Sequence, residues 1–311
     1  MSRVPVFSAG DVHGAVSPER AVEAVRDAFV AYARGEWSMP PKVYVAAYPA
    51  GDFRAMPALG AGHASLKWVT SFPGNPAQGL PTVMGVVLLS DASNGSLVAV
   101  LDAGAVTALR TGAAAFLAAE TLGRRDAESA AVIGAGVNGI ASARAFVAHG
   151  RQVALYDVDP ERAKRAADEL GAAVASREEA LGADLLVTVT PGHEVLLAEG
   201  ALQPGQHVSL MGADGPGKAE IAVDELLRTR IFADDWEQAS HNGELAHAVE
   251  RGLTPDDVTQ LGDVLAGTAP GRQSKDDITI FDSTGLAIQD LAIALAAMDR
   301  ADELDLPSMQ L

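Results

Sequence analysis

A glycine-rich segment carries the most specific chemical pattern in this chain of 311 residues. Gly134, Gly136 and Gly139 are spaced as G-x-G-x-x-G directly after a short apolar run. In such a turn the first glycine bends the chain, the second leaves room for a pyrophosphate, and the third lets helix and strand pack closely. The helix that follows would direct its first amides, from Val137 and Asn138 onward, and a positive dipole end at the anion. The spacing predicts a dinucleotide site.

Asp157 ends the next predicted strand, 18 residues after Gly139. A carboxylate at that place binds ribose hydroxyls, and no basic residue follows it directly, which favours NAD over NADP as the cofactor. The alternative is an ordinary glycine turn with a helix-capping aspartate. Thr188 and Thr190 end a later predicted strand, on the side of the sheet where ligands of open α/β sheets bind. We expect both beside the cofactor, although a plain strand end is an equal alternative.

Lys67 is a second candidate for chemistry. It lies in the strand-like run ASLKWVT, in which alternation places Ser65, Lys67 and Val69 on one face and Trp68 on the other. A lysine in such a strand is either exposed to solvent or functional. The residues alone favour the solvent-exposed interpretation, because lysines are rarely buried without a partner.

Two arginines and an aspartate complete the candidate set. Arg54 lies in DFRAMP, and Arg110 interrupts an apolar helical pattern. Guanidinium groups bind carboxylates through two parallel hydrogen bonds, although a local salt bridge is the simpler interpretation of each. Asp214 follows the fifth predicted strand in a glycine-rich loop, which places it on the cofactor side or in a plain turn. For His241 we favour a surface or packing role over proton transfer.

Short apolar runs alternate with helical patterns from residue 130 onward. This alternation predicts a parallel sheet covered on both faces. The expected helices are 138–149, 160–170 and 285–302, and the expected strands are 130–134, 152–157, 172–175, 184–190, 207–211, 230–234 and 277–281.

The first part of the chain has a different pattern. A helix is predicted over 18–34 and another over 102–122, and between them lie strand-like segments at 43–48, 65–71, 82–89 and 97–101. Asn94 and Gly95 predict a hairpin between the last two segments. We therefore predict an α/β fold: a Rossmann doubly wound parallel sheet over 116–285, plus a second α+β domain formed by 1–115 and 286–311.

Composition excludes several classes of protein. The net charge of −18 disfavours binding to nucleic acid, which requires clusters of lysine and arginine. The absence of cysteine excludes disulfides, thiolate metal sites and cysteine nucleophiles, and no metal site is expected. No apolar run is long enough to span a membrane without proline, and no signal pattern precedes the fold. We expect a cytoplasmic protein without a membrane partner.

Ordered motifs along the whole chain resemble the ornithine cyclodeaminase/μ-crystallin family, and several are most similar to its archaeal-type alanine dehydrogenase branch. The motifs are MPPKVY from Met39, RAMPA from Arg54, LKWV from Leu66, PGNP from Pro73, GLPTV from Gly79, LRTGAA from Leu109, GADGPGK from Gly212 and IFDSTGLAIQD from Ile280.

The resemblance implies roles for the candidates. Lys67 would be a catalytic residue that contacts the substrate, and Arg54 and Arg110 would bind the substrate carboxylate. Asp214 would be the acid/base. The resemblance also places Thr111 near the cofactor phosphates and Ser283 near the nicotinamide. It implies a homodimer in which the second domain, 1–115 with 286–311, binds the substrate and forms the interface. The family commonly has glutamine where this chain has Asn138, whose shorter side chain leaves the main-chain amide as the expected pyrophosphate contact.

These implications predict NAD-dependent oxidation of a small L-amino acid, with L-alanine converted reversibly to pyruvate and ammonia. Three alternatives stay open. A cyclodeaminase would convert ornithine to proline and ammonia without net redox change, and an imine reductase would act on cyclic ketimines. A non-catalytic, crystallin-like protein would bind the cofactor only, but would not need Lys67, Arg54, Arg110 and Asp214.

Overall fold

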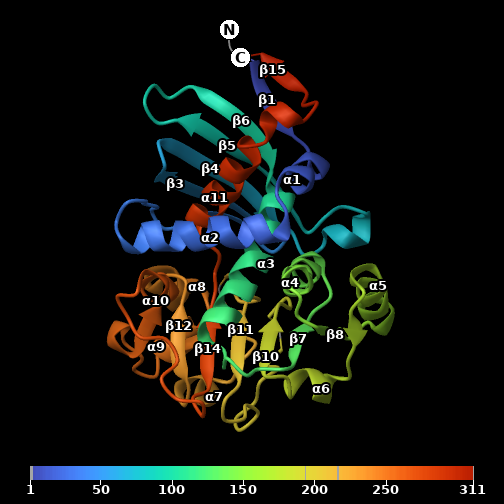
Figure 1. The fold of residues 1–311 in the computed structure, drawn as a ribbon, viewed down its shortest axis with the longest axis vertical. Coiled ribbons are helices and arrows are strands. Elements are labelled where there is room, and N and C mark those ends of the chain that lie inside the picture. The colour runs from blue at the N-terminus through green and yellow to red at the C-terminus, as the bar shows by residue number, and fades with distance from the viewer. Residues whose placement is uncertain (1–2, 193, 216, 311) are drawn as a thin grey trace. The chain divides into compact units, whose positions relative to one another are not determined.

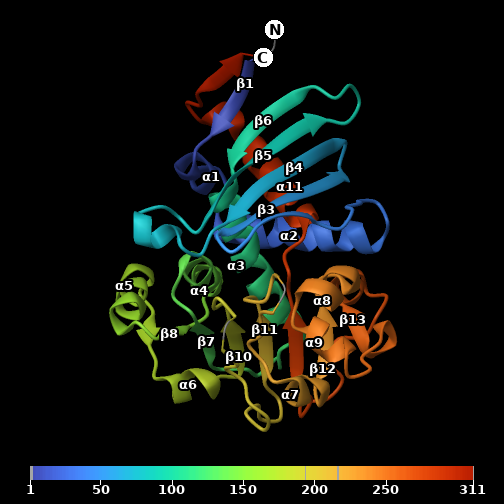
Figure 2. The same ribbon diagram turned by 180° about the vertical axis from the view of Figure 1, so that it is seen from behind.

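The computed structural model describes residues 3–192, 194–215 and 217–310. The chain divides into two units. Unit 1 consists of Met1–Arg110 and Leu286–Leu311, and unit 2 consists of Thr111–Gly285. Figures 1 and 2 show the elements of each unit from opposite sides.

Unit 2 is built on an eight-stranded sheet in the order β13-β12-β14-β11-β10-β7-β8-β9, and every described strand pair is parallel. The chain runs from β7 outward to β9 and then returns to β10 on the other side of β7, so the strand order reverses between β7 and β10. Ligands of open α/β sheets bind at this reversal. The strands are β7 (Ala130–Ile133), β8 (Ala154–Tyr156), β9 (Ala173–Val174), β10 (Leu185–Thr188), β11 (His207–Leu210), β12 (Arg230–Ala233), β13 (Val258–Gln260) and β14 (Thr279–Asp282).

Helices join consecutive strands of unit 2 except β10 and β11, between which the described residues contain none. α5 shows the local rules: Pro160 occupies its first turn, the Asp159 side chain accepts hydrogen bonds from two amides of that turn, and Gly171 ends it with φ of +65°. The helices of unit 2 are α4 (Val137–Ala148), α5 (Pro160–Leu170), α6 (Arg177–Leu181), α7 (Val223–Leu227), α8 (Trp236–Asn242), α9 (Leu245–Val249) and α10 (Leu261–Ala266), with the 3-10 turn η2 (Pro255–Asp257).

Unit 1 contains a seven-stranded sheet in the order β15-β1-β6-β5-β4-β3-β2. All described pairs are antiparallel except β1 with β6. Ala61 and Gly62 both have positive φ and form the tight turn between β3 and β4. The strands are β1 (Arg3–Phe7), β2 (Val43–Ala47), β3 (Gly51–Gly60), β4 (His63–Ser71), β5 (Val83–Asp91), β6 (Leu97–Asp102) and β15 (Ser308–Gln310).

Helices lie over one face of the unit 1 sheet. α11 (Ala287–Met298) packs against β3, β4 and β5 and also against α2 (Pro18–Ala33). α1 (Ala9–Ala15) packs near β6, and the 3-10 turns η1 (Asn75–Gln78) and η3 (Ala301–Glu303) lie in the loops. Figure 2 shows the opposite face of β3–β5, over which no helix of the described residues lies. α3 (Ala103–Leu122) begins in unit 1 and ends in unit 2.

The predicted α/β class with a parallel Rossmann sheet is confirmed, and every strand predicted from the sequence corresponds to a strand here. Several elements were not predicted: the helices α1 and α6–α10, and the strands β1, β3, β13 and β15. β3 carries Pro57 and begins and ends with glycine, which obscures its pattern. The last helix ends at Met298 rather than at 302, because the chain there turns into η3. No helix among the described residues is long and apolar enough to cross a membrane.

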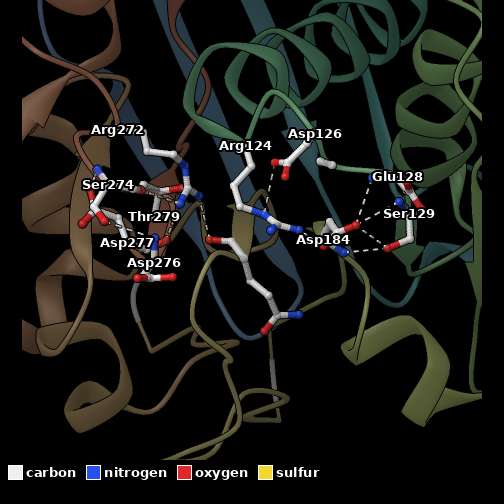
Figure 3. Close-up of polar contacts among 12 residues, drawn as sticks. Arg124, Asp126, Glu128, Ser129, Asp184, Arg272, Ser274, Asp276, Asp277 and Thr279 are labelled. Atoms are coloured by element: carbon white, nitrogen blue, oxygen red, sulfur yellow. Dashed lines mark hydrogen bonds and ion pairs between the residues drawn. The ribbon is translucent and has the colours of Figure 1, made fainter.

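A polar cluster ties the amino edge of the unit 2 sheet together (Figure 3). Asp184, directly before β10, accepts hydrogen bonds from Arg124 at 2.7 Å and from the Ser129 amide at 3.1 Å. Arg272 donates to the main-chain carbonyl of Leu122 at 2.8 Å, which fastens the end of α3. This edge is opposite to the one that carries the glycine turn, so the cluster stabilises the sheet and contributes nothing to the candidate site.

Candidate active site

Lys67 is buried, and the solvent-exposed interpretation of it was wrong. The predicted alternation holds: Ser65, Lys67 and Val69 are buried on one face of β4, while Trp68 is exposed on the other. Lys67 is 1% exposed, because α11 covers this face of the sheet. Lys67 Nζ donates to Asp290 Oδ1 at 2.7 Å, so its burial is compensated by a carboxylate that the sequence analysis did not single out.

Lys67 also donates to the Thr107 hydroxyl of α3 at 3.1 Å. Burial is the largest influence on its pKa and lowers it from 10.5 to about 8. The Asp290 carboxylate opposes this shift, while the positive charges of Arg110 and Arg54 add to it. The Lys67 amine can therefore gain or lose a proton at mildly alkaline pH, as a group that transfers protons must.

Arg54 and Arg110 extend the positive charge around Lys67. Arg54, on the buried face of β3, donates to Asp52 Oδ1 at 2.7 Å and lies over the Tyr44 ring at 5.2 Å. Arg110 Nε is 3.7 Å from Asp290 Oδ1 and makes no hydrogen bond within the described residues. An unsatisfied guanidinium nitrogen that is buried is suited to an anionic ligand.

We call these five residues, Lys67, Arg54, Arg110, Asp52 and Asp290, the charged cluster. It lies entirely in unit 1 and draws on β3, β4, α3 and α11. Three positive charges face two negative charges, which leaves one positive charge when Lys67 is protonated. Such an arrangement can bind one carboxylate and hold a proton-exchanging amine beside it.

The glycine turn in unit 2 has the geometry that a dinucleotide needs. Gly134 has φ of +105°, and a β-carbon at Gly139 would lie 1.7 Å from the Gly134 carbonyl oxygen, so strand and helix touch there. A β-carbon at Gly136 would meet no atom within 4 Å, which leaves open space before α4. Gly136 caps α4 without a side-chain hydrogen bond, so the first helix amides, including those of Val137 and Asn138, face that space uncapped.

Asp157 lies directly after β8 beside this turn. Its Oδ2 accepts from the Ala135 amide at 2.8 Å, and its Oδ1 accepts from the Asp159 amide at 2.9 Å. Arg162 lies 3.4 Å away on the first turn of α5, although no basic residue follows Asp157 directly. Val137 and Val158 beside the site are 72% and 83% exposed, which makes them available for apolar contact with a base or ribose.

The other residues predicted near the cofactor are mostly engaged within unit 2. The hydroxyls of Thr188 and Thr190 both donate to Glu220, at 2.7 Å each. Ser283 is buried after β14 and donates to Asp234 at 3.0 Å. Thr111 is buried where α3 enters unit 2. These contacts make the threonines and Ser283 part of the framework at the carboxyl edge of the sheet.

Asp214 lies in the loop after β11, as predicted, and its side chain is 34% exposed. Lys218 Nζ contacts Asp214 Oδ1 at 2.6 Å. His241 is exposed at the end of α8 and its Nδ1 lies 2.6 Å from the Glu237 carbonyl, which agrees with the surface role favoured for it.

The predicted residues thus form two groups. Lys67, Arg54 and Arg110 meet in unit 1, whereas Asp214 and the residues of the glycine turn lie in unit 2. Four polar residues at these places were not predicted from the sequence: Asp52, Thr107, Asp290 and Glu220. The available signals were a carboxylate in an otherwise apolar helix for Asp290, and an acidic residue soon after a glycine-rich loop for Glu220.

These features define a class of dinucleotide-binding proteins that consist of two units. One unit is a Rossmann sheet with a glycine turn at the point where the strand order reverses, and the other contains a buried lysine among arginines. The chain belongs to the ornithine cyclodeaminase/mu-crystallin family, whose model matches residues 5–305. The predicted resemblance is therefore confirmed.

Individual relatives within the family differ in activity. Alanine dehydrogenase of Archaeoglobus fulgidus is 42% identical over 305 residues, which cover 95% of this chain and 94% of that protein. Ornithine cyclodeaminase of Agrobacterium fabrum is 34% identical over 264 residues, which cover 81% and 73%.

Solved structures match over the full chain. An archaeal alanine dehydrogenase dimer with bound NAD has a TM-score of 0.94 at 39% identity, with all of both chains covered. Iminosuccinate reductase of Paracoccus denitrificans in complex with NAD⁺ has a TM-score of 0.90 at 29% identity, also with both chains covered in full.

Proposed function

We propose that this protein catalyses the NAD-dependent oxidative deamination of a small L-amino acid, converting L-alanine reversibly to pyruvate and ammonia. The main support for this proposal is the net charge of the charged cluster. While Lys67 is protonated, the one positive charge in excess matches a substrate with one carboxylate, whose binding would in turn favour the protonated amine. L-Ornithine would add a distal ammonium, yet both carboxylates of the cluster already pair with a cation, Asp52 with Arg54 and Asp290 with Lys67.

NAD is the proposed cofactor. The open space at Gly136, the uncapped amides of α4 and the carboxylate of Asp157 support binding of a dinucleotide with a free ribose diol. Solved relatives carry NAD or NAD⁺. When bound, the nicotinamide would accept a hydride from Cα of the amino acid.

The residues of the chain would perform the remaining steps. Arg54 and Arg110 would hold the carboxylate and so orient Cα. The substrate amine must be neutral before Cα loses hydride, so turnover should rise toward alkaline pH. Lys67 would stabilise charge on the intermediate and on the keto oxygen. Asp214 would activate water and shuttle protons while ammonia departs.

We also propose that the protein is a homodimer that forms through the helix-free face of the unit 1 sheet. Cross-strand neighbours on this face include Val43, Ala55, Trp68 and Val86. Val43 is 55% exposed, and Trp68 and Val86 are 39% exposed each. A contiguous apolar face on a sheet favours association with another protein surface. The archaeal relative that shares the fold is a dimer, which supports a second copy as the occupant.

The deciding experiment offers L-alanine and L-ornithine separately to the purified protein with NAD at alkaline pH. We expect steady formation of NADH and pyruvate with alanine and little with ornithine. Ammonia and proline from ornithine, without net NADH, would replace the proposal with a cyclodeaminase. Inactivity with both, but oxidation of NADH by a cyclic ketimine, would establish an imine reductase.

A further inference from the structure

One buried glutamate joins the carboxyl ends of two neighbouring strands in unit 2. Glu220 is 0% exposed. Its Oε1 accepts from the amide and the hydroxyl of Thr190, at 2.8 and 2.7 Å. Its Oε2 accepts from the Thr188 hydroxyl at 2.7 Å and from the Gly212 amide at 2.9 Å. A single carboxylate thus fastens the end of β10 to the end of β11.

The surroundings of Glu220 leave it no freedom to move. A β-carbon at Gly212 would lie 2.5 Å from the carboxyl carbon of Glu220, so only glycine fits there. The main chain of Glu220 is held too, because its amide donates to Glu244 at 2.7 Å and its carbonyl accepts from the amides of Leu196 and Leu197.

These contacts hold together the two ends of the loop that carries Asp214. The loop starts at Gly212, whose amide is bound to the Glu220 carboxylate, and it ends at Glu220 itself. Asp214 is two residues from the first anchor, and its partner Lys218 is two residues from the second. Both ends of the loop are therefore fixed by the same side chain.

We propose that Glu220 is a positioning residue for the reaction, which holds Asp214 and the Thr188–Thr190 segment in the arrangement that proton transfer beside the cofactor requires. The inference rests on the proposed function, which makes Asp214 the acid/base. Glu220 acts through these neighbours and does not itself touch the reacting atoms.

Hydrogen-bond chemistry explains why a glutamate is needed. Each carboxylate oxygen faces one main-chain N–H, of Thr190 or of Gly212, whose hydrogen cannot turn away. A glutamine would direct its NH₂ at one of these amides in either orientation, so one anchor would be lost at almost unchanged volume. Burial raises the pKa of Glu220, but a protonated carboxyl would still fit because a threonine hydroxyl can reverse and accept.

Glu225 provides a matched control in the same unit. It is also 0% exposed and also accepts two main-chain amides, of Gly200 at 2.7 Å and of Leu202 at 2.6 Å. These amides precede β11, at the amino edge of the sheet. Glu225→Gln therefore tests the cost of losing a buried carboxylate without disturbing the Asp214 loop.

The first measurement is hydrogen exchange of the main-chain amides in the full-length protein. Glu220→Gln should raise exchange at Thr190 or Gly212, while Glu225→Gln should raise it at Gly200 or Leu202 only. Unchanged protection at both Thr190 and Gly212 would overturn the inference.

The second measurement is a double-mutant cycle on turnover. Glu220→Gln should lower kcat at least about tenfold in the wild-type background and change it less than about twofold in the Asp214→Asn background, because residues that act as one unit are not additive. Glu225→Gln should leave kcat within about twofold in both. Losses that multiply would show a structural role instead and would overturn the inference.

A separate readout distinguishes failure of the proposed function from failure of this inference. If the wild-type protein turns over neither alanine, ornithine nor a cyclic ketimine, NADH affinity measured by fluorescence replaces kcat. Glu220→Gln should then weaken NADH binding at least about tenfold relative to Glu225→Gln, and equal affinities would overturn the positioning role.

Discussion

Lys67 Nζ lies 2.7 Å from Asp290 Oδ1, although the two residues are 223 positions apart in the chain. The contact joins β4, from the first part of unit 1, to α11, near the end of the chain. Asp290 also lies 3.7 Å from Arg110, so one buried carboxylate orients two of the three cations of the charged cluster. Asp290 Oδ2 has no hydrogen-bond partner among the described residues, so the contacts of this buried carboxylate within them are those that Oδ1 makes with cations.

Asp290→Asn should shift the pH dependence of turnover to lower pH. The pKa of Lys67 is about 8, because burial and, to a lesser extent, the two arginines lower it while the Asp290 carboxylate raises it. Without that negative charge the protonated amine loses support and its pKa falls further. We would measure kcat/KM for alanine from pH 6 to 10. The limb of this profile that reflects the titration of Lys67 should move to lower pH. Asp52→Asn, whose carboxylate pairs with Arg54, should move it less, and an unmoved limb in Asp290→Asn would contradict the assignment.

Arg110→Met should raise KM for alanine by about 10- to 100-fold, since a hydrogen bond to a charged group contributes roughly 1.5–3 kcal/mol. The Nε atom of Arg110 has no hydrogen-bond partner within the described residues, and Lys67 would still pair with Asp290 in the variant. The loss should therefore fall on substrate binding more than on folding. NADH affinity should stay unchanged. Arg144→Met, which removes a surface ion pair with Glu169, is the control and should leave KM unaltered. Equal KM values in the two variants would exclude Arg110 from carboxylate binding.

Asp157→Ser should weaken the preference for NAD. Its carboxylate repels a 2′-phosphate, while Arg162 lies only 3.4 Å away and would attract one once the aspartate is gone. We expect kcat/KM for NAD to fall about tenfold and that for NADP to rise. Asp168→Ser, which removes a surface ion pair with Lys164 further along α5, should keep the original ratio. A ratio that is the same in both variants would show that Asp157 does not select the cofactor.

The free energy of unfolding should fall less with rising pH in Glu244→Gln than in the wild-type protein. Burial, with the nearby charges of Asp282 and Glu220, raises the pKa of Glu244 to about 9. The folded state thus holds a proton that the unfolded chain releases near pH 4.5, so stability falls as pH rises between these values. Glutamine does not titrate and can keep the short hydrogen bond from the Glu220 amide.

Urea denaturation at pH 6 and pH 9 measures this effect. The midpoint should fall less between the two pH values in Glu244→Gln than in the wild-type protein. Glu225→Gln should differ from the wild type by the same amount at both, because the pKa of Glu225 is lowered and its titration lies below this window. Parallel curves for Glu244→Gln would mean that this carboxyl titrates normally.

Val86→Glu should convert the proposed dimer to a monomer. Val86 is 39% exposed on the helix-free sheet face, directly opposite Trp68. A glutamate there would have to enter the interface without a partner. Light scattering should give the mass of two 32.0 kDa chains for the wild type and of one for the variant. Val147→Glu, at a 37% exposed valine of α4, should remain dimeric, and a dimeric Val86→Glu would place the interface elsewhere.

Local sequence patterns were sufficient to predict much of unit 2. Its elements depend on neighbours within a few residues, so spacing and residue type determine them. Examples are the glycine turn before α4, the buried strands β7, β10 and β11, and the ends of α5. β13, with three residues, is too short to show a periodicity of its own.

The environment of Lys67 depended on the tertiary structure. Alternation placed Lys67 and Val69 on one face of β4, but a period of two does not say which face a helix will cover. Packing of α11 on that face buried the lysine and supplied Asp290 from the far end of the chain. The same holds for Glu220, whose carboxylate joins two strand ends that only the parallel sheet brings together. Residue type and spacing were enough to predict the main strands of unit 2 and its glycine turn. Contacts between distant segments established which charges meet, because burial and ion pairing are properties of the packed chain.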